Sequence, residues 1–258
     1  MTPVRLERDG GVAVITFDAP PLNLFDAALG EALRAALAEL ESASPRAVLF
    51  RAEGRVVSGG VDVSLFAAQA DEDAATDTFE SLVEIARRVE RLPCPTVFAA
   101  HALCLTWAFE LALACDLIVA ARSARFGLVE IVVGLTPAMG GTQRLAERAG
   151  SGRARELVMS GETYDAETLA GWNVVNRVLE DAGFQDAARE LARTLANGPT
   201  LAHAATKRVI GAYREGGVPL ADERVGRIAG DLFGTEDLRN AVRSFLEQGP
   251  GQASFEAR

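Results

Sequence analysis

Apolar and polar residues alternate with two different periods along the first 180 residues, and each change of period marks a new element. Val4–Arg8 and Val12–Phe17 alternate with a period of two across Asp9-Gly10-Gly11, which predicts a β-hairpin. Leucines then recur on one face of a helix expected over Ala27–Glu41. The short apolar run Ala47–Phe50 predicts a buried strand after that helix.

The same strand and helix patterns continue in the middle of the chain. Helical spacing predicts a helix over Thr78–Arg91, and the small, acidic residues 67–75 before it predict a mobile loop. Thr96–Ala100 predicts a buried strand, His101–Thr106 a turn, and a further helix begins near Trp107. Repeated strand–turn–helix units of this kind indicate an α/β fold up to about residue 180.

The last sixty residues have a different pattern, which is helical throughout. We expect helices over Leu201–Arg214, Leu220–Leu232 and Glu236–Gln248, and a loose tail from Gly249 to Arg258. Their surplus apolar face predicts packing on a neighbouring subunit. We therefore predict two regions, a core over 1–196 and a helical oligomerisation region over 197–258.

Charge and composition narrow the classes of function. The 258 residues carry a net charge of −10, so we expect no nucleic-acid partner. No apolar run reaches the length of a membrane span, and the first residues lack an apolar signal core, so we expect a cytoplasmic protein without a membrane partner. With two histidines a multi-His metal site is excluded, and no metal is expected. The three cysteines are interpreted as buried free thiols.

Two carboxylates stand in strongly apolar surroundings. Glu110 opens the run ELALAC, and Glu130 lies between FGLV and IVV. A buried carboxylate must find partners, become neutral or take part in chemistry, because an isolated buried charge is costly. Each glutamate is therefore either a catalytic group or a satisfied acid of the core.

A glycine pair elsewhere in the chain is a candidate for backbone N–H donors that would contact a ligand beside these glutamates. Ser58-Gly59-Gly60-Val61-Asp62 is either an ordinary turn or a loop whose backbone N–H groups approach a ligand closely. A second group of free N–H donors is expected at the helix start near Trp107, where they suit a developing oxyanion.

Nearly the whole chain resembles the enoyl-CoA hydratase/isomerase family, the crotonase superfamily. The resemblance rests on the opening VAVITFDAPPLN, the loop SGGVD, ELALACD, ARFGLVE, GLTPAMGGTQRL, SGETYDAETLAGWNVVNRV and the ending TEDLRNAVRSFLE. It implies an α/β (α+β) fold, a spiral of ββα units with a C-terminal helical trimerisation region. It also implies homotrimers, often paired into homohexamers.

The resemblance further implies an acyl-CoA substrate, with coenzyme A as part of that substrate and no separate cofactor. The backbone N–H groups of Gly59 and Trp107 correspond to the oxyanion hole, and Glu110 and Glu130 to the acid/base pair. Glu110 corresponds to the base that activates water and Glu130 to the proton donor. Further substrate or CoA contacts are assigned by the same correspondence to Leu22, Asn23, Ser58, Gly60, Val61 and Asp62.

The chain departs from the family pattern directly before Glu110. The family has Asn-Gly-x-x-x-Gly-Gly-Gly-x-Glu there, whereas this chain reads HALCLTWAFE without any glycine. Thr106 and Trp107 adopt positive φ only at a cost, so we expect a rebuilt turn. The indole of Trp107 either lines the acyl pocket or points into the core. Lys207 and Arg208 are candidates for CoA phosphate contacts, against the alternative of a solvated helix face.

The resulting hypothesis is an enoyl-CoA hydratase that works through a stabilised enolate. Having both glutamates favours hydration over double-bond isomerisation, which is the enzymatic alternative together with a pathway-specific hydratase. The rebuilt turn motivates a third hypothesis, a non-catalytic acyl-CoA-binding homologue.

Overall fold

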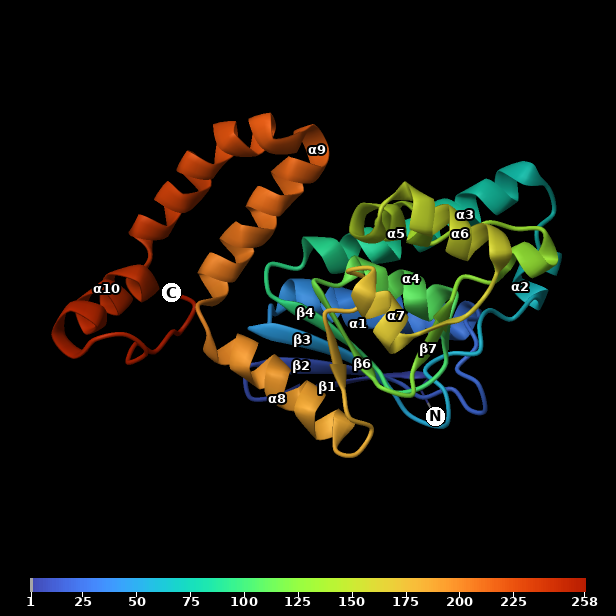
Figure 1. Ribbon diagram of the computed structural model, residues 1–258, viewed down its shortest axis with the longest axis horizontal. Helices are drawn as coiled ribbons and strands as arrows, with labels where there is room; N and C mark the ends of the chain where they lie inside the picture. The colour runs from blue at the N-terminus through green and yellow to red at the C-terminus, as the bar shows by residue number, and fades with distance from the viewer. Residues whose placement is uncertain (1) are drawn as a thin grey trace.

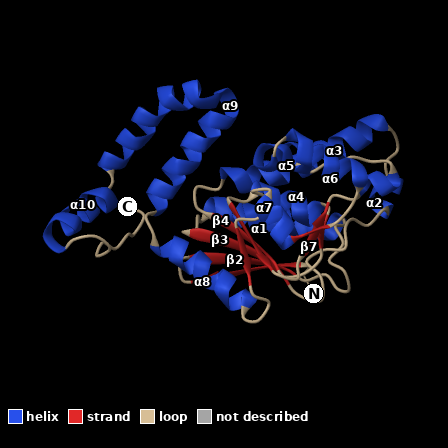
Figure 2. Cartoon of the chain, viewed as in Figure 1, coloured by secondary structure: helices blue, strands red, loops and turns tan. Residues whose placement is uncertain are grey.

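A six-stranded sheet forms the centre of the molecule. The computed structural model describes residues 2–258, and its main sheet has the strand order β1-β2-β3-β4-β6-β9 (Figures 1 and 2). Its strands are β1 (Val4–Asp9), β2 (Val12–Phe17), β3 (Ala47–Ala52), β4 (Thr96–Ala100), β6 (Leu117–Ala121) and β9 (Arg177–Leu179).

The predicted hairpin and the parallel strands are confirmed. β1 and β2 pair antiparallel with Val4 opposite Phe17, and every later pairing in this sheet is parallel. Parallel neighbours need a crossover, and helices α1 (Ala27–Ser42), α3 (Glu72–Arg91) and α4 (Trp107–Ala114) supply three of these. Helix α8 (Phe184–Asn197) packs on β2, β3 and β4, on the other side of the sheet from α1 and α4 (Figure 1). The main strands are buried on both faces, which explains their nearly continuous apolar sequences.

A second, small sheet adjoins the first and carries the turn before Glu110. Its three short strands have the order β5-β7-β8. They are β5 (Cys104–Leu105), β7 (Arg125–Gly127) and β8 (Tyr164–Asp165). The remaining short helices of the core are α2 (Ser64–Ala67), η1 (Glu130–Val133), α5 (Gly141–Ala149), α6 (Ser151–Ser160) and α7 (Ala166–Gly171), of which α7 contacts β8.

Helix α3 begins earlier than the sequence pattern predicts. The expected loop over residues 67–75 is wrong for its second half, because α3 starts at Glu72. The Asp71 side chain caps the helix by accepting the Ala74 N–H at 2.9 Å, and Glu72 and Asp73 occupy the positively polarised first turn. A cap and a helix dipole therefore outweigh the absence of apolar periodicity in this segment.

The C-terminal helices form an arm that extends away from the sheet (Figure 1). Helix α9 spans Thr200–Asp231, and η2 (Leu232–Gly234) and α10 (Glu236–Gln248) follow it. Gly216 and Gly217 interrupt α9 with non-helical dihedral angles, and Pro219 lies in the first turn after the break. The two helices predicted before and after this point are thus confirmed. The division of the chain at residue 196 stays a prediction.

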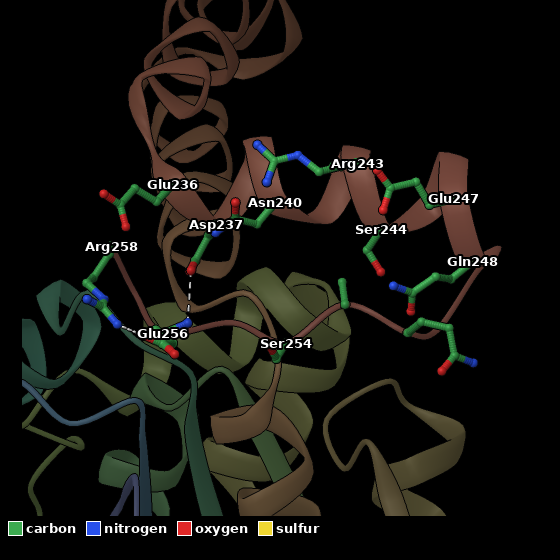
Figure 3. A pocket seen from close by; sticks show the side chains of 12 residues that line it. Glu236, Asp237, Asn240, Arg243, Ser244, Glu247, Gln248, Ser254, Glu256 and Arg258 are labelled. Carbon is green, nitrogen blue, oxygen red and sulfur yellow. Dashed lines mark hydrogen bonds and ion pairs between the residues drawn. The ribbon is translucent and has the colours of Figure 1, made fainter.

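The tail is attached to the start of α10, so the prediction of a loose tail is wrong. The Asp237 carboxylate accepts the Glu256 N–H at 2.9 Å (Figure 3), and it also accepts the Ala257 N–H at 2.9 Å. The Asp237 N–H in turn donates to the Arg258 carbonyl at 2.9 Å. A single buried carboxylate at the N-terminus of α10 therefore holds the last residues of the chain. The sequence of the tail itself does not predict this contact.

The prediction for the three cysteines is confirmed, whereas Lys207 has a role that was not predicted. Cys94, Cys104 and Cys115 are buried free thiols. Lys207 belongs neither to a solvated face nor to a free cationic site. Its ammonium pairs with Asp116 at 2.8 Å and donates to the Cys94 carbonyl at 3.1 Å, which fastens α9 to the sheet.

Candidate active site

Two loops meet beside the N-terminus of α4. The loop that contains Ser58 runs along β5, where Val57 and Ser58 donate their N–H groups to the Leu103 carbonyl. Leu105 donates back to the Ser58 carbonyl at 3.1 Å. This pairing places the Ser58–Asp62 loop next to the turn that starts α4. Residues nearly fifty positions apart thereby become neighbours.

Asn23 holds both loops in place and uses up its side chain in doing so. Its amide donates to the three carbonyls of Glu53, Val56 and Val57, and its Oδ1 accepts the Ala19 N–H at 2.7 Å. Its own carbonyl accepts the Ser58 hydroxyl at 3.1 Å and the Trp107 indole N–H at 3.2 Å. These bonds give the Asn23 side chain a positioning role, and the substrate contact that the family resemblance assigned to Asn23 stays a prediction.

The free backbone donor in the glycine loop is Val61 rather than Gly59. The Gly59 N–H donates to the Leu22 carbonyl at 2.7 Å, so it is occupied. Phe25 forms a parallel β-bridge with Val61, in which the Phe25 N–H donates to the Gly60 carbonyl and the Phe25 carbonyl accepts the Asp62 N–H. In a parallel bridge the N–H of the residue between these two, Val61, points away from Phe25. Within residues 2–258 it has no hydrogen-bond acceptor. The assignment of Gly59 as a donor therefore conflicts with this geometry, and Val61 takes its place.

Thr106 adopts the conformation that a glycine usually provides. Its φ and ψ are 50° and −120°, a region that a β-branched residue enters at a cost of about 1–3 kcal/mol. Its N–H donates to the Gly127 carbonyl at 2.9 Å, which ties the turn to β7. Thr106 therefore takes the positive φ that a threonine was expected to avoid, and the rebuilding of the turn relative to the family stays a prediction.

Trp107 is the first residue of α4 and combines both roles considered for it. Its indole is buried, with ring centroids 4.9 Å from Phe17 and 5.6 Å from Phe25. It also lines the cavity between the two glutamates. Its backbone N–H, at the helix N-terminus, has no acceptor among the described residues. Trp107 and Val61 thus offer two free N–H groups at one site.

Glu110 lies on the first turn of α4 and is held by the next helix. Its Oε2 accepts the N–H groups of Met139 at 2.8 Å and Gly141 at 2.7 Å. Its pKa is raised to about 8, first by burial and then by the charge of Glu130, while the two N–H bonds lower the pKa and offset part of the rise. Gly141 has to be a glycine here, since a Cβ would lie 2.6 Å from the Glu110 Cγ.

Glu130 begins η1, separated from the end of β7 by two residues, and its side chain has no hydrogen-bond partner in the described chain. Only 7% of the residue is exposed, and both carboxylate oxygens are buried and unpaired. Burial raises its pKa to about 7. A buried, unpaired carboxyl is expensive for stability, which makes a structural role in the core a poor explanation.

The two glutamates line one small apolar cavity of about 20 Å³. That volume is enough for one water molecule. Apart from the glutamates, its lining is apolar and consists of Phe25, Val61, Phe66, Phe79, Leu82, Trp107, Leu135, Ala138 and Met139. An apolar enclosure with two carboxyls and two nearby N–H donors is suited to proton transfer next to a polarised carbonyl group.

Two further residues predicted to contact the substrate adjoin the glycine loop, and their contacts stay predictions. Leu22 is 40% exposed and accepts the Gly59 N–H through its carbonyl, and the Asp62 carboxylate accepts the Ser64 N–H at 2.9 Å. A polar cavity of about 420 Å³ between α10 and the tail shares no residue with the glutamate cavity (Figure 3).

In the described chain, no three His, Cys, Asp or Glu side chains form a group that could hold a metal ion. No helix within residues 2–258 combines the length and apolar character that crossing a bilayer requires.

Known proteins share this architecture along almost their full lengths. The family model for enoyl-CoA hydratase/isomerase matches residues 7–257. A protein of Bacillus subtilis named "Probable enoyl-CoA hydratase" is 30% identical, with 96% of this chain and 97% of the relative covered. Carnitinyl-CoA dehydratase of Salmonella enteritidis is 35% identical, with 82% and 81% covered. The crystal structure of enoyl-CoA hydratase from Bacillus anthracis superposes with a TM-score of 0.91 at 25% identity, covering 99% and 100%.

Proposed function

We propose that this chain, which belongs to the enoyl-CoA hydratase/isomerase family, adds water across the C2=C3 bond of a 2-enoyl-CoA thioester. The observation that carries the proposal is the cavity with room for one water between Glu110 and Glu130. Relatives named as a hydratase and as a dehydratase support it, because dehydration is the same reaction run backwards.

The backbone N–H groups of Val61 and Trp107 act as the oxyanion hole in this proposal. When water adds to C3, negative charge moves onto the thioester oxygen and an enolate forms. Two N–H donors that are already fixed and unpaired stabilise this charge without reorganisation, and one such donor is worth about 3–4 kcal/mol in the transition state. Polarisation by backbone groups needs no cofactor beyond the CoA that is part of the substrate.

The glutamate pair supplies the acid and the base. One carboxylate takes a proton from the water molecule while the water oxygen bonds to C3. The other carboxyl delivers a proton to C2 as the enolate collapses. With pKa values of about 8 and about 7, the pair holds one proton between these two pH values. Near neutral pH the site therefore contains one acid and one base at once.

Both carboxyls face the same cavity and titrate as a coupled pair, so the shared proton belongs to the pair. The family resemblance makes Glu110 the base and Glu130 the proton donor. This assignment places the shared proton on Glu130 when water attacks C3, and the opposite assignment places it on Glu110.

The proposal includes an assembly of three or six identical chains. The arm exposes eight large apolar side chains, which are Ile210, Tyr213, Val218, Val225, Phe233, Val242, Phe245 and Leu246. Apolar side chains gathered on an extended arm are typical of a subunit interface.

Turnover of trans-2-enoyl-CoA thioesters of increasing chain length tests the function, followed as loss of absorbance of the conjugated thioester. We expect hydration of at least one member of the series. Glu110→Gln and Glu130→Gln should each reduce kcat by a factor of about 1,000 while acyl-CoA binding persists. Glu31→Gln, an exposed change on α1, is the control and should keep the wild-type rate.

Absence of turnover across the whole series would refute the hydratase assignment. A Glu110 or Glu130 variant with the full rate would remove that residue from the mechanism. Product analysis separates the alternatives, since hydration yields a 3-hydroxyacyl thioester and isomerisation moves the double bond without adding oxygen.

A further inference from the structure

We propose that the hydroxyl group of Thr106 donates a third hydrogen bond to the bound thioester, beside the N–H of Trp107. The proposal deepens the proposed function and rests on acyl-CoA binding at the same site. It concerns the turn in which this chain departs most from the glycine-rich pattern of its family.

The Thr106 hydroxyl is buried and has no partner. Only 5% of the residue is exposed, and Oγ1 makes no hydrogen bond in the described chain. A buried hydroxyl without a partner destabilises the folded state, since water would have satisfied it in the unfolded chain. Such a group is explained if a ligand supplies the missing acceptor.

The backbone at Thr106 adds a second, independent cost. With φ at 50°, the residue occupies a conformation that glycine adopts freely and a β-branched side chain does not. A glycine would remove both the strain and the unpaired hydroxyl. Keeping a threonine therefore indicates a use for its side chain.

The position of the side chain points to the thioester as that use. Thr106 directly precedes Trp107, whose N–H is one free donor. Its Oγ1 also lies 3.6 Å from the place that a Cβ on Gly60 would take, and Gly60 directly precedes Val61, the other donor. The hydroxyl thus lies where the two donor loops face each other.

Packing alone is the competing explanation for the threonine. Its methyl group lies 3.7 Å from the place that a Cβ on Gly60 would take, so it also fills the space beside Gly60. Thr106→Val keeps the branched shape, the methyl contact and the strain, and removes only the hydroxyl. Thr106→Ser keeps the hydroxyl and removes the methyl group. Thr106→Gly removes the side chain and the strain together.

The experiment measures kcat for enoyl-CoA hydration, the thermal midpoint, and the infrared carbonyl frequency of bound butyryl-CoA labelled with ¹³C at the thioester carbon. We expect Thr106→Val and Thr106→Gly to lose about tenfold in kcat. In Thr106→Val and Thr106→Gly the carbonyl frequency of bound butyryl-CoA should differ less from its solution value than it does in the wild type. Thr106→Ser should resemble the wild type in both kcat and carbonyl frequency. Thr106→Gly should be at least as heat-stable as the wild type despite its lower kcat.

Thr16→Val is the matched control, since Thr16 in β2 is 1% exposed and its hydroxyl is also unpaired. It should keep the wild-type kcat and carbonyl frequency. Wild-type values of both in Thr106→Val would overturn the proposal while the hydratase function stands. If the wild type binds butyryl-CoA but hydrates no substrate, the function fails and the carbonyl frequencies still decide the role of Thr106. If it binds no acyl-CoA, both are wrong.

Discussion

Replacing Glu110 by glutamine should make the protein more stable at alkaline pH while abolishing its proposed chemistry. The Glu110 carboxyl is buried, its pKa is raised from 4.5 to about 8, and burial is the largest cause. Glutamine has nearly the same shape and can still accept the N–H groups of Met139 and Gly141 through its oxygen. The substitution therefore removes the ionisation and keeps most of the contacts.

The size of the effect follows from the change in pKa. Because the folded-state pKa lies above the unfolded one, the folded protein binds this proton more tightly between pH 4.5 and pH 8. The contribution of Glu110 to the free energy of unfolding is thus greatest below pH 4.5 and is lost as pH rises to about 8. At about 1.4 kcal/mol for each tenfold change in protonation, the loss amounts to about 5 kcal/mol. Glu110→Gln should abolish this loss.

Urea unfolding at pH 5, 7 and 9 measures the difference between Glu110→Gln and the wild type at one fixed protein concentration. We expect similar stabilities at pH 5 and a variant more stable by several kcal/mol at pH 9. Glu31→Gln should follow the wild type at every pH. A difference between Glu110→Gln and the wild type that stays constant from pH 5 to pH 9 would refute the reasoning.

Three further substitutions test the positioning of the site and the arm. Gly141→Ala brings a Cβ to 2.6 Å from the Glu110 Cγ, displaces that carboxyl and should lower kcat for enoyl-CoA hydration roughly 100-fold. Gly152→Ala is the control, because a Cβ there has no atom within 4 Å, and it should leave kcat unchanged. Asn23→Ala removes the side-chain bonds to the Glu53, Val56 and Val57 carbonyls before the Ser58–Asp62 loop and should cost about 3 kcal/mol in urea unfolding; an unchanged midpoint would contradict its role. Leu246→Asp on α10 should yield smaller species in light scattering after size exclusion, and an unaltered mass would argue against the arm as an interface.

The fold was largely predictable because its signals are local. Strand alternation, helical spacing and the glycine turn of the hairpin each lie within a few residues, and the resemblance covered nearly the whole chain. Errors arose where one side chain decided an element boundary. Asp71 starts α3 by capping it, and Asp237 holds the tail through residues about twenty positions away.

The glutamates could be found from sequence, whereas the geometry of the donors could not. Charged residues in apolar segments are visible without a structure, and so is the family spacing of Glu110 and Glu130. Which N–H of the glycine loop is free depends on the Leu22 carbonyl and on the bridge to Phe25, which are contacts between distant segments. The strain and the unpaired hydroxyl of Thr106 likewise become visible only in three dimensions.

The pH dependence of kcat/KM for hydration tests the central claim most directly, because the claim is that two carboxyls share one proton in the resting site. The account predicts a bell-shaped profile with its maximum between pH 7 and pH 8, falling below about 7 as both carboxyls become protonated and above about 8 as both ionise. A rate that stays level from pH 6 to pH 9 would contradict the account.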